Sequence, residues 1–234
     1  MRVRGASGGF LFVKGNTVVP MPYIYVSDLK VDSLFESIPR NLLKELSVEF
    51  NVNLNLIGLS IKRDTPDETR YSKLRIVTSY LEKHGDIGDI ESPKAYFKGT
   101  LDMAYGKWPE GTVYFAGWPR DDFVLGLGGS LHHIIGSTAS LQEMSPSLAP
   151  SMISVLAKEL KLPDSASNQN DTGFAFRIVA AAADHISKRV LIKQKLEFLA
   201  LKLMDGKIDD SKAETGTTRK KRVLLGSPVY VRLA

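Results

Sequence analysis

The chain has 234 residues, of which 43% are hydrophobic and 24% charged, with no cysteine and a formal net charge of +5. This composition is typical of a globular protein that can bury its own core, and it excludes disulfides and cysteine-based metal centres. No apolar run reaches the roughly 18 to 20 residues of a membrane-spanning helix. We therefore expect a cytoplasmic protein without membrane association.

The expected domain organisation is a short N-terminal extension, residues 1–20, followed by a single α/β domain, residues 21–234. The extension contains only a short apolar patch, and a signal peptide would need a longer one.

In the first half of the domain, the pattern predicts a strand, two helices, a second strand and a longer helix. Residues 23–26 are aromatic and β-branched, as in a strand. Apolar residues from Val31 to Ile38 recur at helical spacing, and Pro39 ends that helix and begins another. Alternation over residues 52–61 indicates a half-buried strand, and residues 71–84 have a helical pattern.

The middle of the chain has the strongest β pattern. Three expected strands, separated by turns rich in Gly, Pro and Asp, predict an antiparallel meander. They are residues 95–105, 112–117 and 123–127.

The last part of the domain returns to a helical pattern. Residues 147–160 are expected to be helical, and residues 174–204 form a long helical segment with a bend or break near Val190. Residues 222–233 are interpreted as a C-terminal strand that is interrupted at residues 226–228. The element order predicts an α+β or mixed α/β fold, with a single central, partly antiparallel sheet, the three-strand meander and packed helices.

Three segments resemble motifs of an uncharacterised bacterial protein family. They are YIYVSDLKVD at residues 23–32, VLGLGGSLHHIIG at residues 124–136 and LGSPVYV at residues 225–231. The resemblance implies kinship over residues 23–231, and it supplies no activity, ligand, cofactor or catalytic residue.

The best candidate for a ligand site is the glycine-rich loop at residues 126–133. There a strand is expected to end in glycines and a helix to begin near Ser130, so that free amides at the helix N-terminus attract an anion. We therefore predict a binding or sensor module for a small anionic metabolite, of which a nucleotide-like ligand is one kind. The expected ligand-binding residues are Gly126, Gly128, Gly129, Ser130, His132 and His133.

The loop also has a purely structural interpretation. It is neither a Walker motif nor a complete Gly-x-Gly-x-x-Gly pattern, because Leu131 stands where the third glycine belongs. Glycines in a strand often mark close packing, and Ser130 alone could cap the helix.

A hydrolase-type enzyme using the same loop is the first alternative. His132 or His133 would act as the base, with Asp28 or Asp32 as its partner. The two aspartates lie four residues apart, on one face of the expected helix, where they could also bind a metal or favour the helix start electrostatically. No metal site is predicted from histidines, because none pairs with another at a spacing of three or four residues.

The second alternative is a nucleic-acid or protein-interaction subunit. Residues 173–234 contain 13 Lys or Arg against 6 Asp or Glu, a net charge of +7. The run Arg219, Lys220, Lys221 and Arg222 could neutralise phosphates. Basic residues beside a strand also protect its end from pairing, and no aromatic residues are interleaved with this run.

Overall fold

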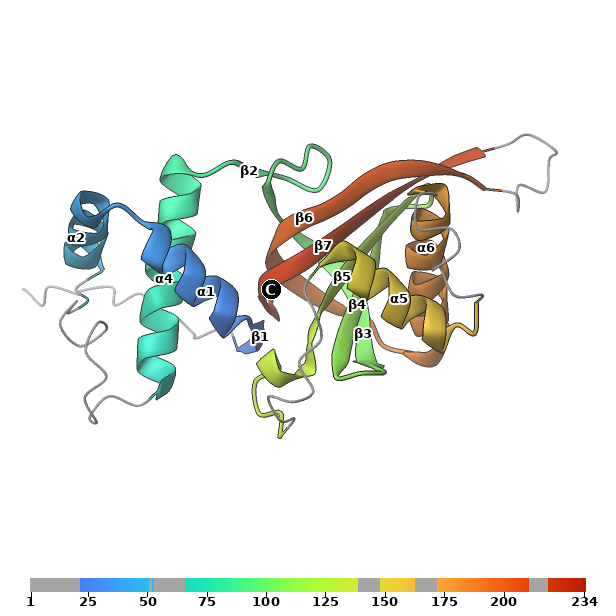
Figure 1. The fold of residues 1–234 in the computed structure, drawn as a ribbon, viewed down its shortest axis with the longest axis horizontal. Helices are drawn as coiled ribbons and strands as arrows, with labels where there is room; N and C mark the ends of the chain where they lie inside the picture. The colour runs from blue at the N-terminus through green and yellow to red at the C-terminus, as the bar shows by residue number, and fades with distance from the viewer. Residues whose placement is uncertain (1–21, 51, 53–65, 139–147, 163–171, 211–218) are drawn as a thin grey trace, which may run out of the picture.

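The computed structural model describes residues 22–50, 52, 66–138, 148–162, 172–210 and 219–234. These residues form one curled sheet with a group of helices on each side (Figure 1). The α+β fold with a partly antiparallel central sheet is therefore confirmed. Among the described helices, none is long and apolar enough to cross a membrane.

Five strands close the sheet into a barrel. β3 (Tyr96–Trp108), β4 (Thr112–Arg120) and β5 (Phe123–Ser130) form the meander that the sequence predicts, each strand longer than expected. On its other side, β5 pairs in parallel with β7 (Arg219–Leu233). β6 (Gln194–Asp210) lies between β7 and β3, antiparallel to both, and so completes the ring.

Alternate side chains of these strands fill the barrel, since successive residues of a strand point to opposite faces. The interior is apolar and rich in aromatic rings, with Phe97 and Phe198 packed edge to face and Tyr105 stacked on Phe115. The buried strand residues of this inner cluster are Phe97, Met103, Val113, Phe115, Phe123, Leu125, Leu127, Leu196, Phe198, Ala200, Leu224 and Val231.

The N-terminal elements cover one side of the barrel. β1 (Tyr23–Val26) adds to β7 as an antiparallel strand, and α1 (Asp28–Ser37), α2 (Arg40–Glu49) and α4 (Pro66–His84) follow it. Their predictions are confirmed, including the change of helix at Pro39. The strand predicted over residues 52–61 lies almost entirely outside the described residues.

The remaining helices pack on the opposite side of the barrel (Figure 1). α5 (Ala149–Glu159) and α6 (Thr172–Arg189) bury apolar faces against the outward side chains of β3, β4, β5 and β7. A short β2 (Ile87–Gly88) pairs in parallel with the start of β3. The barrel wall is therefore buried from both directions over much of its length.

The prediction of a helical segment over residues 174–204 is wrong beyond Arg189, because residues 194–204 belong to β6. The cause is burial on both faces of the strand. Leu196 and Phe198 point into the barrel while Leu199 is buried on its outside. A strand buried on both sides reads as a nearly continuous apolar run, which periodicity alone cannot distinguish from a helix.

Two smaller expectations are also corrected. The predicted helix after Gly129 is only a three-residue 3-10 turn, η1 (Leu131–His133), since β5 continues through Ser130. The C-terminal strand begins at Arg219 and is not interrupted at residues 226–228. Its pairing with β6 shifts register there, as in a β-bulge.

Candidate functional site

The glycine-rich segment lies within the barrel wall rather than in a loop. Gly126, Gly128 and Gly129 are buried residues of β5, paired in register with Ala116, Tyr114 and Val113 of β4.

Each of these glycines is covered by a larger side chain. A Cβ atom on Gly128 would lie 2.5 Å from Met152 of α5, and one on Gly129 would lie 2.5 Å from the Tyr25 hydroxyl. Tyr114 covers Gly126 in the same way. These positions are glycine because neighbouring side chains occupy the space, which is the packing role that glycines take in strands.

The expected cradle of amides at a helix N-terminus does not form. The Leu131 amide donates to the Gly111 carbonyl at 2.6 Å, which continues the β4–β5 pairing. Hydrogen-bonded residue pairs alternate along an antiparallel ladder, so the backbone amide of Gly129 also points towards β4. The Ser130 hydroxyl accepts from the His132 amide at 3.3 Å, so Ser130 caps the short turn.

The three sequence motifs meet at one end of the barrel. Tyr25 of the first motif pairs with Val231 of the third and bridges to Ile134 of the second. The Ser27 amide also donates to the Val229 carbonyl at 2.9 Å. We use the name strand-end cluster for the polar residues gathered there, which are Tyr25, Ser27, Asp28, Lys30, Ser130, His132 and His133.

His133 is a buried histidine of the strand-end cluster with a strongly perturbed pKa. It is 6% exposed, and its ring packs edge to face against Tyr25 with 5.7 Å between centroids. Burial lowers the pKa of His133 to about 4; Asp28 opposes this effect, whereas Lys30 adds to it. The imidazole is therefore neutral near pH 7, and its Nδ1 atom has no hydrogen-bond partner among the described residues.

The Tyr25 hydroxyl is a second buried polar group in this cluster. Burial raises the pKa of Tyr25, while Ser27 and the Ser130 backbone lie close enough to oppose part of that rise. The hydroxyl nevertheless makes no hydrogen bond of ordinary geometry within the described part of the chain. Buried polar atoms are almost always paired, so unpaired ones call for an explanation such as a bound water or ligand.

Lys30 supplies a half-buried cation. Its Nζ donates to the Ser27 hydroxyl at 3.3 Å, and burial lowers the pKa of Lys30 to about 8. A lysine in this position can hold an anion as an ammonium and can also release its proton near physiological pH.

The two aspartates predicted as candidates face α4 instead of the histidines. Asp28 accepts a bidentate pair from Arg70, at 2.7 Å from Nε and 3.0 Å from Nη2. Asp32 pairs with Lys73 at 2.6 Å. Both carboxylates therefore join α1 to α4. Within the described residues, no group of three or more His, Asp or Glu side chains is placed to hold a metal ion.

The basic C-terminal run is divided by strand alternation. Lys220 and Arg222 line a hollow of about 470 Å³ at the other end of the barrel, together with Arg120, Asp205 and Lys207. Lys221 belongs to the opposite face of β7. Arg219 pairs in register with Asp210 at the far end of the hairpin. The run is therefore not one continuous basic surface.

Asp28, Ser130, His132 and His133 were predicted from the sequence as site residues, whereas Tyr25 and Lys30 were not. Both belong to the first motif, YIYVSDLKVD, which was noted only as a resemblance. A lysine in the first turn of the predicted helix, between Asp28 and Asp32, would have been the available signal. Its proximity to His133, more than 100 residues later, depends on the tertiary fold.

The structure defines the class of protein as a helix-flanked, closed α+β barrel with a polar cluster at one end. The chain belongs to a family of unknown function, DUF7019, which it matches over residues 22–234. The resemblance to an uncharacterised family is thereby confirmed. No curated protein and no solved structure shows significant similarity to the chain.

Proposed function

We propose that the protein is a cytoplasmic binding or sensor module that recognises a small anionic metabolite at the strand-end cluster. One observation carries the proposal. The Lys30 ammonium and the Ser27 hydroxyl lie where three distant segments meet, near two buried polar atoms, Tyr25 Oη and His133 Nδ1, that have no partner within the described residues.

The chemistry of these groups suits an anion. Lys30 and Ser27 can donate hydrogen bonds to a carboxylate or phosphate oxygen, and a neutral His133 can donate from one ring nitrogen. Hydrogen bonds to a charged group are stronger than neutral ones, more so where water is partly excluded. An anion would also offset the cost of keeping Lys30 charged in its half-buried position.

Binding is supported better than hydrolysis. A His–Asp pair would require the imidazole to hydrogen-bond a carboxylate, but both oxygens of Asp28 face Arg70. Asp32 is likewise paired with Lys73. The amide-based version of the anion site has no support, because the glycines lie in a strand. The proposal therefore rests on side chains.

The proposal is tested by a thermal-shift series with inorganic phosphate, adenosine monophosphate and small carboxylates, which lack two adjacent phosphate groups. An anion at 100 times its Kd stabilises the folded state by about 2.7 kcal/mol, which corresponds to a rise in Tm of roughly 5 to 10 °C for a chain of this size. Lys30→Gln should abolish the rise. Lys44→Gln, which removes an exposed cation from α2, is the matched control and should retain it.

Histidine NMR links any binding to this site. The ligand should shift the ring resonances of His133, assigned through His133→Gln, more than those of His84 on α4. If no anion stabilises the wild type, or if Lys30→Gln responds like Lys44→Gln, the proposal is wrong.

A further inference from the structure

The opposite end of the barrel has a charged hollow that is separate from the strand-end cluster. Arg120, Asp122, Asp205, Gly206, Lys207, Lys220 and Arg222 line it. The guanidinium groups of Arg222 and Arg120 lie over the fully buried ring of Phe123, at 4.6 and 5.5 Å from its centroid. We use the name charged mouth for these residues.

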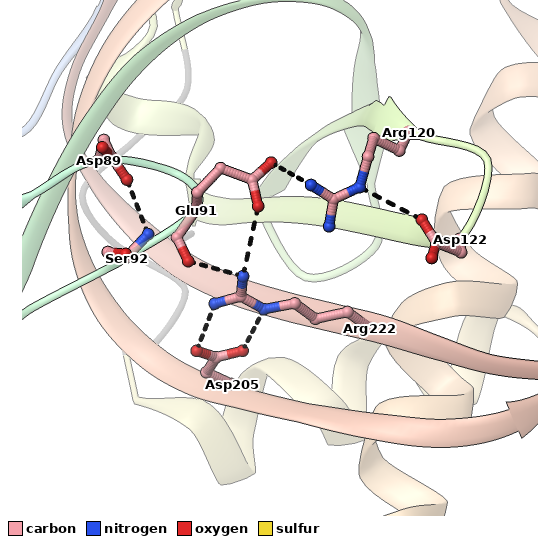
Figure 2. Close-up of polar contacts among 7 residues, drawn as sticks. All are labelled: Asp89, Glu91, Ser92, Arg120, Asp122, Asp205 and Arg222. Carbon is pink, nitrogen blue, oxygen red and sulfur yellow. Dashed lines mark hydrogen bonds and ion pairs between the residues drawn. The ribbon is translucent and has the colours of Figure 1, made fainter.

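Part of the charged mouth is a fixed scaffold, shown in Figure 2. Arg222 donates from Nε and Nη2 to Asp205 at 2.9 and 2.8 Å, and from Nη1 to the Glu91 carbonyl at 2.8 Å. The Glu91 carboxylate reaches Arg120 at 2.7 Å. Arg222 is only 18% exposed on its side chain, whereas Arg120 and Glu91 are each about half exposed. Arg222 is therefore held in place, and Arg120 is the arginine that can exchange partners.

The remaining cations of the charged mouth have no such partner. Lys207 and Lys220 are exposed, and neither makes an ion pair with a described residue. The lining holds four cations, Arg120, Lys207, Lys220 and Arg222, against two carboxylates, Asp122 and Asp205. Glu91, which pairs with Arg120 beside the lining, adds a third carboxylate, so one cation is in excess. Like charges gathered around one hollow repel one another, so this arrangement favours an anionic occupant.

The register of the hairpin brings the two lysines together. Lys207 pairs with Arg222, and Lys220 pairs with Asp209, which makes Lys207 and Lys220 diagonal neighbours on one face of β6 and β7. Diagonal neighbours lie roughly 7 to 8 Å apart, so both flexible ammonium groups can contact a single compact ligand. Asp205 is already neutralised by Arg222.

We infer that the charged mouth binds a compact ligand with two adjacent phosphate groups, independently of the strand-end cluster. Lys207 and Lys220 would contact one phosphate each, and Arg120 would leave Glu91 to join them. Arg222 stays paired with Asp205. The volume of about 470 Å³ is within the range of small-molecule sites.

The probe is pyrophosphate, titrated into the full chain by calorimetry at fixed ionic strength. Lys207→Gln and Lys220→Gln should each weaken binding about tenfold, as expected for loss of one charge-assisted hydrogen bond. Glu91→Gln should tighten binding roughly threefold, since it removes the carboxylate that competes for Arg120. Lys207 and Lys220 are exposed, and the Glu91 side chain is 51% exposed, so all three variants should fold.

Two controls separate this site from the others. Lys195→Gln removes an exposed cation from the other end of β6 and should leave pyrophosphate affinity unchanged. Lys30→Gln should also leave it unchanged, so failure of the strand-end proposal would not affect this one. Absence of pyrophosphate binding would overturn the inference. So would a loss in Lys195→Gln equal to that in Lys207→Gln, or weaker binding in Glu91→Gln.

Discussion

The hydroxyl oxygen of Tyr25 lies 2.5 Å from the point that a Cβ atom on Gly129 would occupy. The only motif tyrosine that is completely buried therefore requires a glycine more than 100 residues away. This relationship explains why the glycine-rich segment looks like a ligand loop in the sequence while serving as packing surface in the fold. It also gives a direct test of the structure.

Gly129→Ala should destabilise the protein by about 1 to 3 kcal/mol, because the added methyl group overpacks the barrel against Tyr25. Tyr25→Phe should be nearly neutral, since its hydroxyl has no partner within the described residues. The double variant should recover part of the loss, because removing the oxygen relieves the closest contact. Urea unfolding of all four proteins gives the coupling energy; strictly additive effects would contradict the contact.

His133 should make stability depend on pH in acid. Its pKa is about 4 in the fold against 6.5 ordinarily. Between these values the unfolded chain holds a proton that the folded chain does not, so stability rises with pH across the window and is lost as pH falls through it. The slope is about 1.4 kcal/mol per pH unit.

His133→Gln should remove this component, as measured by urea unfolding at several pH values within and above the window. His84→Gln, a change at the exposed end of α4, serves as the control. Identical slopes in the wild type and in His133→Gln would show that His133 is not held neutral by burial.

Lys30 should titrate near pH 8 instead of 10.5, because its position is half-buried. NMR of the protein with ¹³C-methylated lysines would follow this directly, with Lys30→Met assigning the signal. Since the folded state loses the proton first, stability gains from Lys30 as pH rises from about 8 to 10.5. A bound anion should move the midpoint upward, and an unchanged midpoint at saturation would place the anion elsewhere.

The Arg222–Asp205 pair should stabilise the β6–β7 hairpin through its bidentate geometry. Arg222→Lys keeps the charge but loses the planar fork and its contact with Phe123, and we expect a loss of about 1 to 2 kcal/mol. Arg222→Ala combined with Asp205→Ala should cost less than the sum of the two single changes. Thermal unfolding would measure both effects. An Arg222→Lys variant as stable as the wild type would mean that charge alone matters.

The local sequence pattern correctly predicted the elements that have one apolar face and one polar face. Val31 and Ile38 mark one apolar side of α1, and Pro39 marks the next helix start, so both were recognised. β6 was misread because Phe198 and Leu199 are buried on opposite faces. The closure of the sheet rests on the β3–β6 pairing, which joins residues nearly 100 positions apart. No short-range pattern encodes such a pairing.

The candidate site was also predicted only in part, because its residues are brought together by contacts between distant parts of the chain. Ser130 and His133 stood out because glycines precede them, and both lie in the strand-end cluster. The partners of Asp28 and Asp32 could not be foreseen, since Arg70 and Lys73 are about 40 residues away on another helix. The basic run looked continuous in the sequence, but alternate residues of a strand point to opposite faces, so Lys220 and Arg222 reach the charged mouth while Lys221 points away from it.

The position of β7 in the barrel has a consequence for how the chain folds. β7 pairs with β1, β5 and β6, and it is the last element along the chain. During synthesis, the edges of β5 and β6 that pair with β7 stay unpaired until residues 219–233 have left the ribosome. Such long-range closure is slow and exposes strand edges to other chains. The partly synthesised chain is therefore prone to pair with other chains until β7 is in place.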